Sequence, residues 1–138
     1  MWESLGWIFA GAIEDFTRWR RRKKEMAIKD TMLAAFKGVN DYSPDAIMAC
    51  WERDGVYDNP MVGGPAEGYD AVRQCMVNLV NTFKPNGQSL VVDRLTVGKT
   101  NVIAEWHVEP RDGRRGVHVA EFSTAGKLKR VTVYPRAT

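Results

Sequence analysis

The chain is poor in the residue types from which metal and disulfide sites are built. Its 138 residues include two cysteines, Cys50 and Cys75, and two histidines, His107 and His118. These four residues show no spacing typical of a zinc site, so we expect no metal. Each cysteine falls in an apolar helical pattern, which favours reduced core thiols and a cytoplasmic location. No glycine-rich phosphate loop is present, and we expect no cofactor.

The sequence also lacks a positive charge that extends along the whole chain. It has 20 Lys+Arg against 17 Asp+Glu, a formal net charge of +3. Residues 17–24, here called the basic octet, carry six basic side chains and no acid, and the remainder has 14 basic and 17 acidic residues. This distribution argues against a nucleic-acid-binding domain and leaves one local basic cluster to explain.

No apolar run is long enough to cross a membrane, because Glu14 and Asp15 interrupt the N-terminal apolar positions. The positive charges follow the apolar part instead of preceding it, unlike a secretory signal. Apolar residues recur at intervals of three and four, which predicts an amphipathic helix. They are Trp2, Leu5, Phe9, Ala12, Phe16 and Trp19.

Several roles for this N-terminal helix stay open. Its apolar face could pack on the domain or on a second subunit. Alternatively, it could lie on a membrane surface, with Trp2, Trp7 and Trp19 at the headgroup level and the basic octet facing anionic lipid. Nucleic-acid binding through the octet is the remaining alternative. We treat residues 1–25 as an amphipathic extension and residues 26–138 as one domain.

The rest of the chain changes from helical to strand periodicity. Nothing that breaks a helix separates the N-terminal pattern from the next, so the two could form one long helix. Short turns join the last four strands, which predicts antiparallel hairpins. Helices are expected over 25–39, 45–54 and 70–83, a glycine-rich loop over 61–68, and strands over 56–58, 89–98, 101–109, 115–123 and 127–134. This order predicts an α+β domain with helices on one face of a bent sheet.

Three motifs carry a family resemblance. Residues 45–60 look like a helix leading into an acid-Pro turn, residues 68–73 (Gly-Tyr-Asp-Ala-Val-Arg) like a G-x-(E/D)-A-(I/V)-R helix start, and residues 125–128 (Ala-Gly-Lys-Leu) like the hairpin before a last strand. Over residues 26–136 the chain thus resembles the SnoaL-like branch of the nuclear-transport-factor-like superfamily. That group includes ketosteroid isomerase, scytalone dehydratase, limonene epoxide hydrolase and polyketide cyclases.

The resemblance implies a cone-shaped, cystatin-like α+β barrel, in which a curved antiparallel sheet wraps on helices. It also implies a deep apolar pocket for a hydrophobic small molecule and a homodimer formed through the outer face of the sheet. Residues 1–25 lie outside the family pattern. The fold alone does not fix the function, because the superfamily hosts several reactions and non-enzymes.

The resemblance also places candidate catalytic residues. The position of the isomerase base is Asn59, whose amide cannot act as a carboxylate base. Asp58 is adjacent and points to the opposite strand face, unless the turn brings it inward. His118 falls near a pocket position and is the best candidate proton carrier. Tyr57 shares a strand face with Asn59 and could donate a hydrogen bond.

Other positions complete the expected pocket. The acid-base set of the epoxide hydrolase falls on Trp106, Val108 and Thr132, so that chemistry is not expected. Alternation along 101–109 places His107 on the solvent side of its strand. The expected apolar wall consists of Trp106, Phe36, Met32, Phe122, Val131 and Val133.

These observations predict a hydrophobic small-molecule pocket for a polyketide- or steroid-like compound. As an enzyme it would be a cofactor-free isomerase, dehydratase or cyclase that works by proton transfer. The alternative is a non-catalytic ligand-binding or assembly module whose N-terminal helix docks a partner or a membrane surface. We expect a homodimer and no nucleic-acid partner, with peripheral membrane contact through residues 1–25 as an open alternative.

Overall fold

The computed structural model describes the backbone of residues 2–136 and the side chains of residues 13–136. The helices are α1 (Trp2–Asn40), α2 (Pro44–Met48) and α3 (Tyr69–Phe83), with 3-10 turns η1 (Pro60–Val62) and η2 (Lys84–Asn86). The strands are β1 (Trp51–Asn59), β2 (Gly64–Glu67), β3 (Ser89–Val97), β4 (Asn101–Glu109), β5 (Arg115–Phe122) and β6 (Leu128–Arg136). The predicted α+β plan is confirmed.

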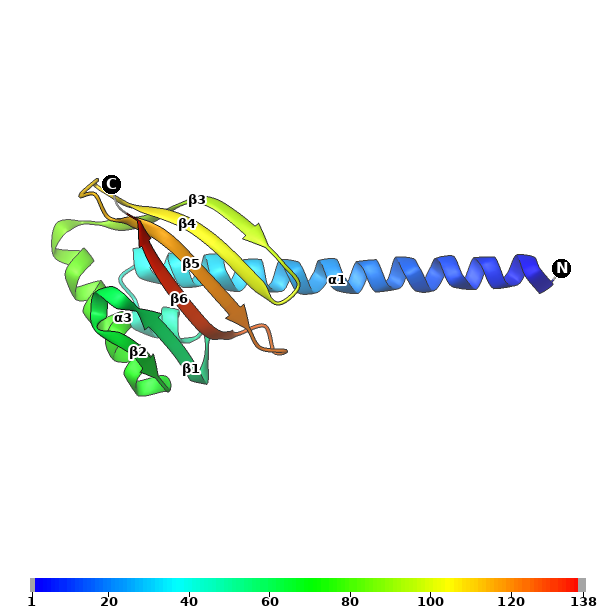
Figure 1. Cartoon of the computed structure of the whole chain (residues 1–138), viewed down its shortest axis with the longest axis horizontal. Coiled ribbons are helices and arrows are strands. Elements are labelled where there is room, and N and C mark those ends of the chain that lie inside the picture. Colours follow the sequence, from blue (N-terminus) through cyan, green and yellow to red (C-terminus); the bar gives the residue numbers. More distant parts are fainter. Residues whose placement is uncertain (1, 137–138) are drawn as a thin grey trace.

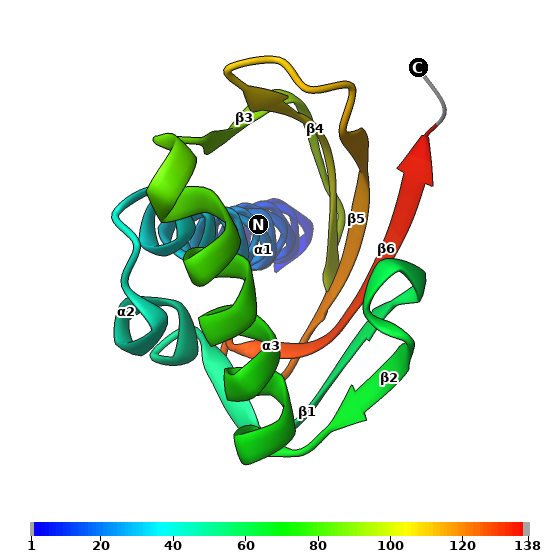
Figure 2. The ribbon, with the colours of Figure 1, turned by 90° about the vertical axis from the view of Figure 1, so that its left-hand side faces the viewer.

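One curved sheet forms the wall of the domain. Its strand order is β2-β1-β6-β5-β4-β3, and Figure 2 shows it bending around α1, with α2 and α3 on the opposite side of that helix. Short turns make β3 to β6 an antiparallel meander. The expectation of a wholly antiparallel sheet is corrected at one pair, because β1 runs parallel to β6. A long connection separates these two strands in the chain, so no hairpin constrains their direction.

Helix α1 is continuous from Trp2 to Asn40, as the unbroken sequence pattern allowed. Among its described side chains, those buried in the domain lie in its C-terminal half, and they are Ile28, Met32, Ala35, Phe36 and Val39. In Figure 1 the other half projects beyond the end of the sheet. Among the residues described, no helix is long and apolar enough to span a membrane.

The apolar side chains between residues 13 and 26 do not pack on the domain. Ile13, Phe16, Trp19 and Met26 are 65%, 56%, 54% and 62% exposed. Packing on the domain, one of the roles left open above, is therefore wrong for this segment. The stretch from residue 1 to residue 12 falls outside the described side chains.

The predicted helix over 45–54 is wrong beyond Met48. Ser43 caps α2 by accepting from the backbone N–H of Ala46, but the helix ends after five residues. Trp51 then begins β1 and pairs with Leu128, where its indole is buried. Burial of this aromatic side chain in the sheet outweighs the helical periodicity of its neighbours. Gly55 suits the bulge that follows, since a Cβ there would lie 2.6 Å from the Trp51 ring.

The expected glycine-rich loop over 61–68 is more ordered than predicted. It contains the end of η1 and the short edge strand β2, which pairs antiparallel with β1. Gly63, Gly64 and Gly68 all have positive φ, so they turn the chain between these elements. The loop thereby returns the chain to β1 and positions the start of α3 against the sheet.

The core lies between the concave face of the sheet and the helices. The predicted alternation of β4 is present, with Val102, Ala104, Trp106 and Val108 buried. From the helical side, α3 contributes Val72, Met76, Val80 and Phe83. Cys50 and Cys75 are free thiols whose pKa values are raised by burial.

Candidate functional site

Tyr57 and Asn59 form a buried polar pair at the end of β1. The alternation of the strand turns both side chains toward the helices. Asn59 Nδ2 donates to Tyr57 Oη at 3.0 Å, and its Oδ1 accepts from the backbone N–H of Met61 at 3.0 Å. Asn59 therefore fixes the start of η1 and orients the phenol. Because Tyr57 accepts from Asn59, its own O–H remains available as a donor, and burial raises its pKa to about 12.

His118 lies on the same inner face, on β5. Trp106 Nε1–H donates to His118 Nδ1 at 2.6 Å, so the neutral imidazole carries its proton on Nε2. The ring also contacts Phe36, with 5.3 Å between centroids. Burial lowers the pKa of His118 to about 4, which makes it neutral at physiological pH. Because Nδ1 accepts this hydrogen bond, the other ring nitrogen, Nε2, presents an N–H donor and not a base.

The Trp106–His118 contact depends on a glycine. Gly116 pairs directly with Trp106 across the β4–β5 ladder. A Cβ at Gly116 would lie 2.9 Å from Cζ2 of Trp106 and 2.8 Å from the carbonyl oxygen of Tyr134. The absence of a side chain at this position leaves room for the indole beside the strand, where it reaches the imidazole.

Two small cavities lie beside these polar groups. Their volumes are about 30 and 40 Å³, and both are lined by Tyr57, Leu90 and His118. Ligand pockets are usually about 300–1,000 Å³, whereas a buried water needs only about 10–15 Å³ of such space. In place of the deep pocket implied by the family resemblance, the structure has here two narrow cavities whose walls share Tyr57, Leu90 and His118.

The predicted site residues divide between these cavities and other places. Met32, Phe36 and Val131 line the smaller cavity, and Asn59 and Trp106 line the larger one. Val133 is buried in the core and Phe122 lines a different hollow near Lys24, so neither borders the two cavities.

Asp58 does not turn inward. It lies on the other face of β1, where it pairs with Arg130 at 3.6 Å. The strand alternation seen in the sequence thus continues up to the turn, and the carboxylate stays outside the pocket.

Sequence reasoning missed the polar rim of the larger cavity. Arg114 donates from Nε to Asp112 at 2.8 Å and from Nη2 to Gln88 at 3.0 Å, and it stacks on Phe83. The side-chain and backbone hydrogen bonds from Arg114 to Asp112, with a further one from Gln88 Nε2, lower the pKa of Asp112 to about 2. Arg114 lies in a turn and Gln88 directly precedes a strand, and neither position belongs to a sequence pattern that predicts a polar rim. Leu90 and Met76 were also missed, because alternation marks them only as core residues.

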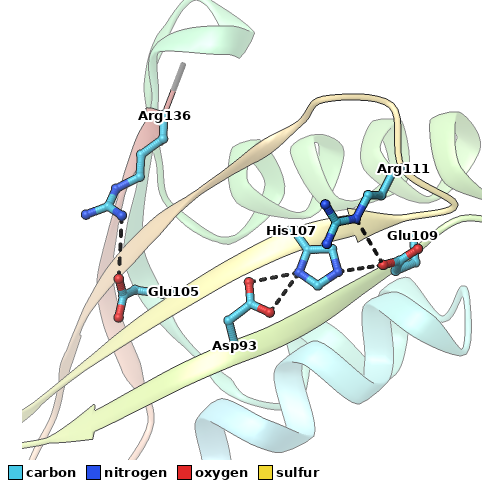
Figure 3. Close-up of polar contacts among 6 residues, drawn as sticks. All are labelled: Asp93, Glu105, His107, Glu109, Arg111 and Arg136. Atoms are coloured by element: carbon cyan, nitrogen blue, oxygen red, sulfur yellow. Dashed lines mark hydrogen bonds and ion pairs between the residues drawn. The ribbon is translucent and has the colours of Figure 1, made fainter. Parts of the chain in front are cut away.

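A second cluster occupies the outer face of the sheet. Figure 3 shows His107 between Asp93 and Glu109, with Nδ1 2.8 Å from Asp93 and Nε2 2.7 Å from Glu109. These carboxylates raise the pKa of His107, and Arg111 approaches Glu109 at 3.7 Å. The cluster borders an open hollow of about 450 Å³. Within residues 13–136, no group of histidine, cysteine and acidic side chains could hold a metal ion.

Comparison with known proteins identifies the family. The SnoaL-like domain matches residues 32–131, so this chain belongs to the SnoaL-like family. The match starts inside α1 and includes Tyr57, Asn59, Trp106 and His118. No curated protein matches the chain.

Solved structures agree on the fold. A protein of unknown function with a cystatin-like fold from Methylobium petroleophilum PM1 has a TM-score of 0.71 and 17% identity, covering 83% of this chain and 78% of its own. A SnoaL-like protein of unknown function from Burkholderia thailandensis E264 has a TM-score of 0.71 and 12% identity, covering 82% and 97%. SalBIII, an epoxide hydrolase/cyclase-like enzyme of pyran ring formation in salinomycin, has a TM-score of 0.69 and 19% identity, covering 81% and 92%.

Proposed function

We propose that this domain binds a hydrophobic small molecule that carries a carbonyl or comparable oxygen, and that Tyr57 and His118 hold this oxygen. The observation that supports the proposal most directly is the pair of neutral donors in an apolar space. Tyr57 keeps its O–H because Asn59 donates to it, and His118 keeps Nε2–H because Trp106 donates to Nδ1. Within residues 13–136, neither of these two hydrogens has an acceptor.

The reaction class that we propose is cofactor-free isomerisation, dehydration or cyclisation of a polyketide- or steroid-like compound. Two donors that converge on a carbonyl oxygen stabilise the negative charge that develops there, and they do so most strongly in a low-dielectric site. Both groups are neutral at pH 7, so they retain their protons before the substrate arrives. The SnoaL-like family and the cyclase-like neighbour are consistent with this class.

The small cavities require the pocket to widen when a ligand binds. The two spaces share Leu90, and flexible side chains, Met32 and Met76, line one of them. Rotation of Leu90 and the methionines would join the spaces without moving the sheet. Arg114 at the rim would then meet the polar end of the ligand.

A second candidate function is ligand binding without turnover. The observation that favours it is the lining itself: among the described residues that border the two cavities, there is no aspartate or glutamate. Proton abstraction usually needs a base with a pKa near the working pH, and His118 is a donor there. Turnover of a ligand recovered with the protein would distinguish an enzyme from a binding protein.

The binding proposal can be tested with prodan, an apolar naphthalene that carries a ketone and whose emission reports polarity and hydrogen bonding. We expect saturable binding with blue-shifted emission, and about three- to tenfold weaker binding for Tyr57→Phe and for His118→Gln, the usual effect of one neutral hydrogen bond. Tyr134→Phe and His107→Gln are matched controls, because both residues lie on the outer face. Absence of saturable binding, or equal losses in the controls, would contradict the proposal.

We also propose that two copies of the chain associate through the outer face of the sheet. An apolar strip crosses β4, β5 and β6 on this face, because Ile103 pairs with Val119 and Val117 pairs with Tyr134. Light scattering coupled to gel filtration should give twice the chain mass, and Ile103→Glu should give the monomer mass. A monomer mass for the unaltered chain would contradict this association.

A further inference from the structure

The part of α1 that projects from the domain carries a surface that does not border the two cavities. We call residues 13–26 the free half of α1. Its side chains between Thr17 and Lys24 include six cations and no acid. None of these cations forms an ion pair within residues 13–136, so their charge is uncompensated.

Aromatic rings and cations alternate closely on this surface. Arg20 lies over the Phe16 ring at 5.7 Å, and Lys23 lies over the Trp19 ring at 4.6 Å. Phe16 and Trp19 also stack on each other, with 5.9 Å between centroids. An aromatic ring with a cationic head beside it suits the boundary between lipid headgroups and acyl chains.

The direction of this surface leaves room for a partner. A helix turns about 100° per residue, so Phe16 and Trp19 lie on one side of α1, here called the exposed stripe, and the buried residues Ile28 and Met32 lie about 170° away on the other side. The domain covers the second side only. A flat surface could therefore contact the exposed stripe without displacing the sheet, as the long projection of α1 in Figure 1 also indicates.

The basic surface extends from the helix to the sheet. A hollow of about 460 Å³ lies between the free half of α1 and the β3–β4 turn. Arg20, Arg21 and Lys24 border it from the helix, and Lys99 borders it from the turn. Four cations around one open hollow attract phosphate-bearing headgroups at the rim of the exposed stripe.

From these observations we propose that the free half of α1 binds the surface of an anionic lipid bilayer, with Phe16 and Trp19 at the headgroup level and the basic octet on lipid phosphates and carboxylates. A second copy fits less well, because it would bring another set of uncompensated cations against the first. Nucleic acid fits less well because it has no apolar layer for Ile13 and Met26, which are largely exposed. The proposal is independent of what the pocket binds.

Vesicle co-sedimentation of the full chain tests this proposal. We expect the protein to pellet with vesicles of phosphatidylcholine and phosphatidylserine, to stay in the supernatant with phosphatidylcholine alone, and to be released by salt. Arg20→Gln/Arg21→Gln/Lys24→Gln should lower the partition coefficient at least about tenfold, because each cation near such a surface contributes to binding.

A matched control removes the same charge elsewhere. Lys29→Gln/Lys84→Gln/Lys129→Gln takes three exposed cations from other parts of the chain and should retain most of the binding. If this control loses vesicle binding as strongly as the Arg20→Gln/Arg21→Gln/Lys24→Gln variant, the interaction depends only on net charge and the proposal is wrong. Failure of the unaltered chain to pellet with anionic vesicles would also overturn it.

The aromatic residues separate lipid from other polyanions. Phe16→Ser/Trp19→Ser should weaken vesicle binding severalfold, whereas Met61→Ser/Val62→Ser, an exposed apolar pair on η1, should not. Unchanged vesicle binding of the aromatic variant, together with equal binding to duplex DNA, would identify a general polyanion site and contradict the proposal. Thermal unfolding should be unaltered in the helix variants, because their side chains do not pack on the domain.

Discussion

The two faces of the sheet each carry one histidine, and their surroundings shift the two pKa values in opposite directions. His118, on the inner face, contacts Trp106 and Phe36, and burial lowers its pKa to about 4. His107, on the outer face, lies between Asp93 and Glu109, which raise its pKa. In the sequence, each histidine lies in a strand segment of the same antiparallel meander, His107 on β4 and His118 on β5.

This comparison shows that the side chains packed around a strand histidine on its own face of the sheet decide what it can do. The inner one is a neutral donor in an apolar space, and the outer one lies between carboxylates that favour its protonated form. Only the inner arrangement suits recognition of an uncharged oxygen on an apolar ligand. The outer arrangement belongs to a polar surface, in which His107 fixes the positions of two acidic side chains.

The largest expected effect concerns packing on the two faces of β3. Leu90 is 6% exposed and lines both cavities, while its neighbour Val91 is 37% exposed on the outer face. Leu90→Ala should lower the free energy of unfolding by about 2–5 kcal/mol and tighten prodan binding by joining the cavities. Val91→Ala should cost less than about 1 kcal/mol. Urea denaturation of both variants measures the difference, and equal losses would show that the faces pack alike.

The next effect is the acid sensitivity that His118 confers. Its folded pKa lies below its unfolded pKa of 6.5, so its neutral form is compatible with the fold above pH 6.5, and stability is lost as the pH falls from 6.5 toward 4. The difference between these pKa values corresponds to about 3 kcal/mol. Unfolding curves between pH 7 and pH 4 should therefore be flatter for His118→Gln than for the unaltered chain. Parallel curves would contradict the buried, neutral state of the ring.

A smaller effect is expected from removing the donor to His118. Trp106→Phe keeps an aromatic ring but leaves Nδ1 without its N–H partner, at a cost of about 1–3 kcal/mol. Because the lost hydrogen bond favours the neutral imidazole, the pKa of His118 should rise in this variant. NMR titration of the His118 ring protons measures it. An unchanged pKa would mean that desolvation alone sets the protonation state.

The smallest effect belongs to the outer histidine and has the opposite sign. The pKa of His107 is raised in the fold, so its stabilising contribution is complete below pH 6.5 and is lost as the pH rises through the raised folded value. His107→Gln should remove this slope while leaving acid unfolding unchanged. Thermal unfolding at pH 6 and pH 9 provides the comparison. A slope that survives the substitution would assign it to other groups.

Periodicity predicted the elements that bury one regular face. The alternation of β4 marked Val102, Ala104 and Val108 as core residues, and the helical spacing marked Met32 and Phe36. It could not orient β5, because both faces of that strand carry apolar residues. The fold orients it through the ladder, which places Ala104 opposite His118.

The parts that sequence could not predict depend on contacts between distant segments. Trp51 belongs to a strand because it pairs with Leu128, which no local pattern records. The size of the cavities depends on how α1 and α3 pack against the sheet. Leu90 is held beside the cavities by the side chain of Asn40, which accepts from the N–H of Leu90 and donates to its carbonyl oxygen. Such contacts follow from the assembled fold.

The continuity of α1 has a mechanical consequence. The sequence between residues 12 and 37 contains neither proline nor glycine, so no hinge interrupts the helix. At about 1.5 Å per residue, Trp19 and Phe36 are held about 25 Å apart along one rod. A partner that holds the end of α1 near Trp19 therefore also sets the axial position and the rotation of the end near Phe36, which borders the smaller cavity.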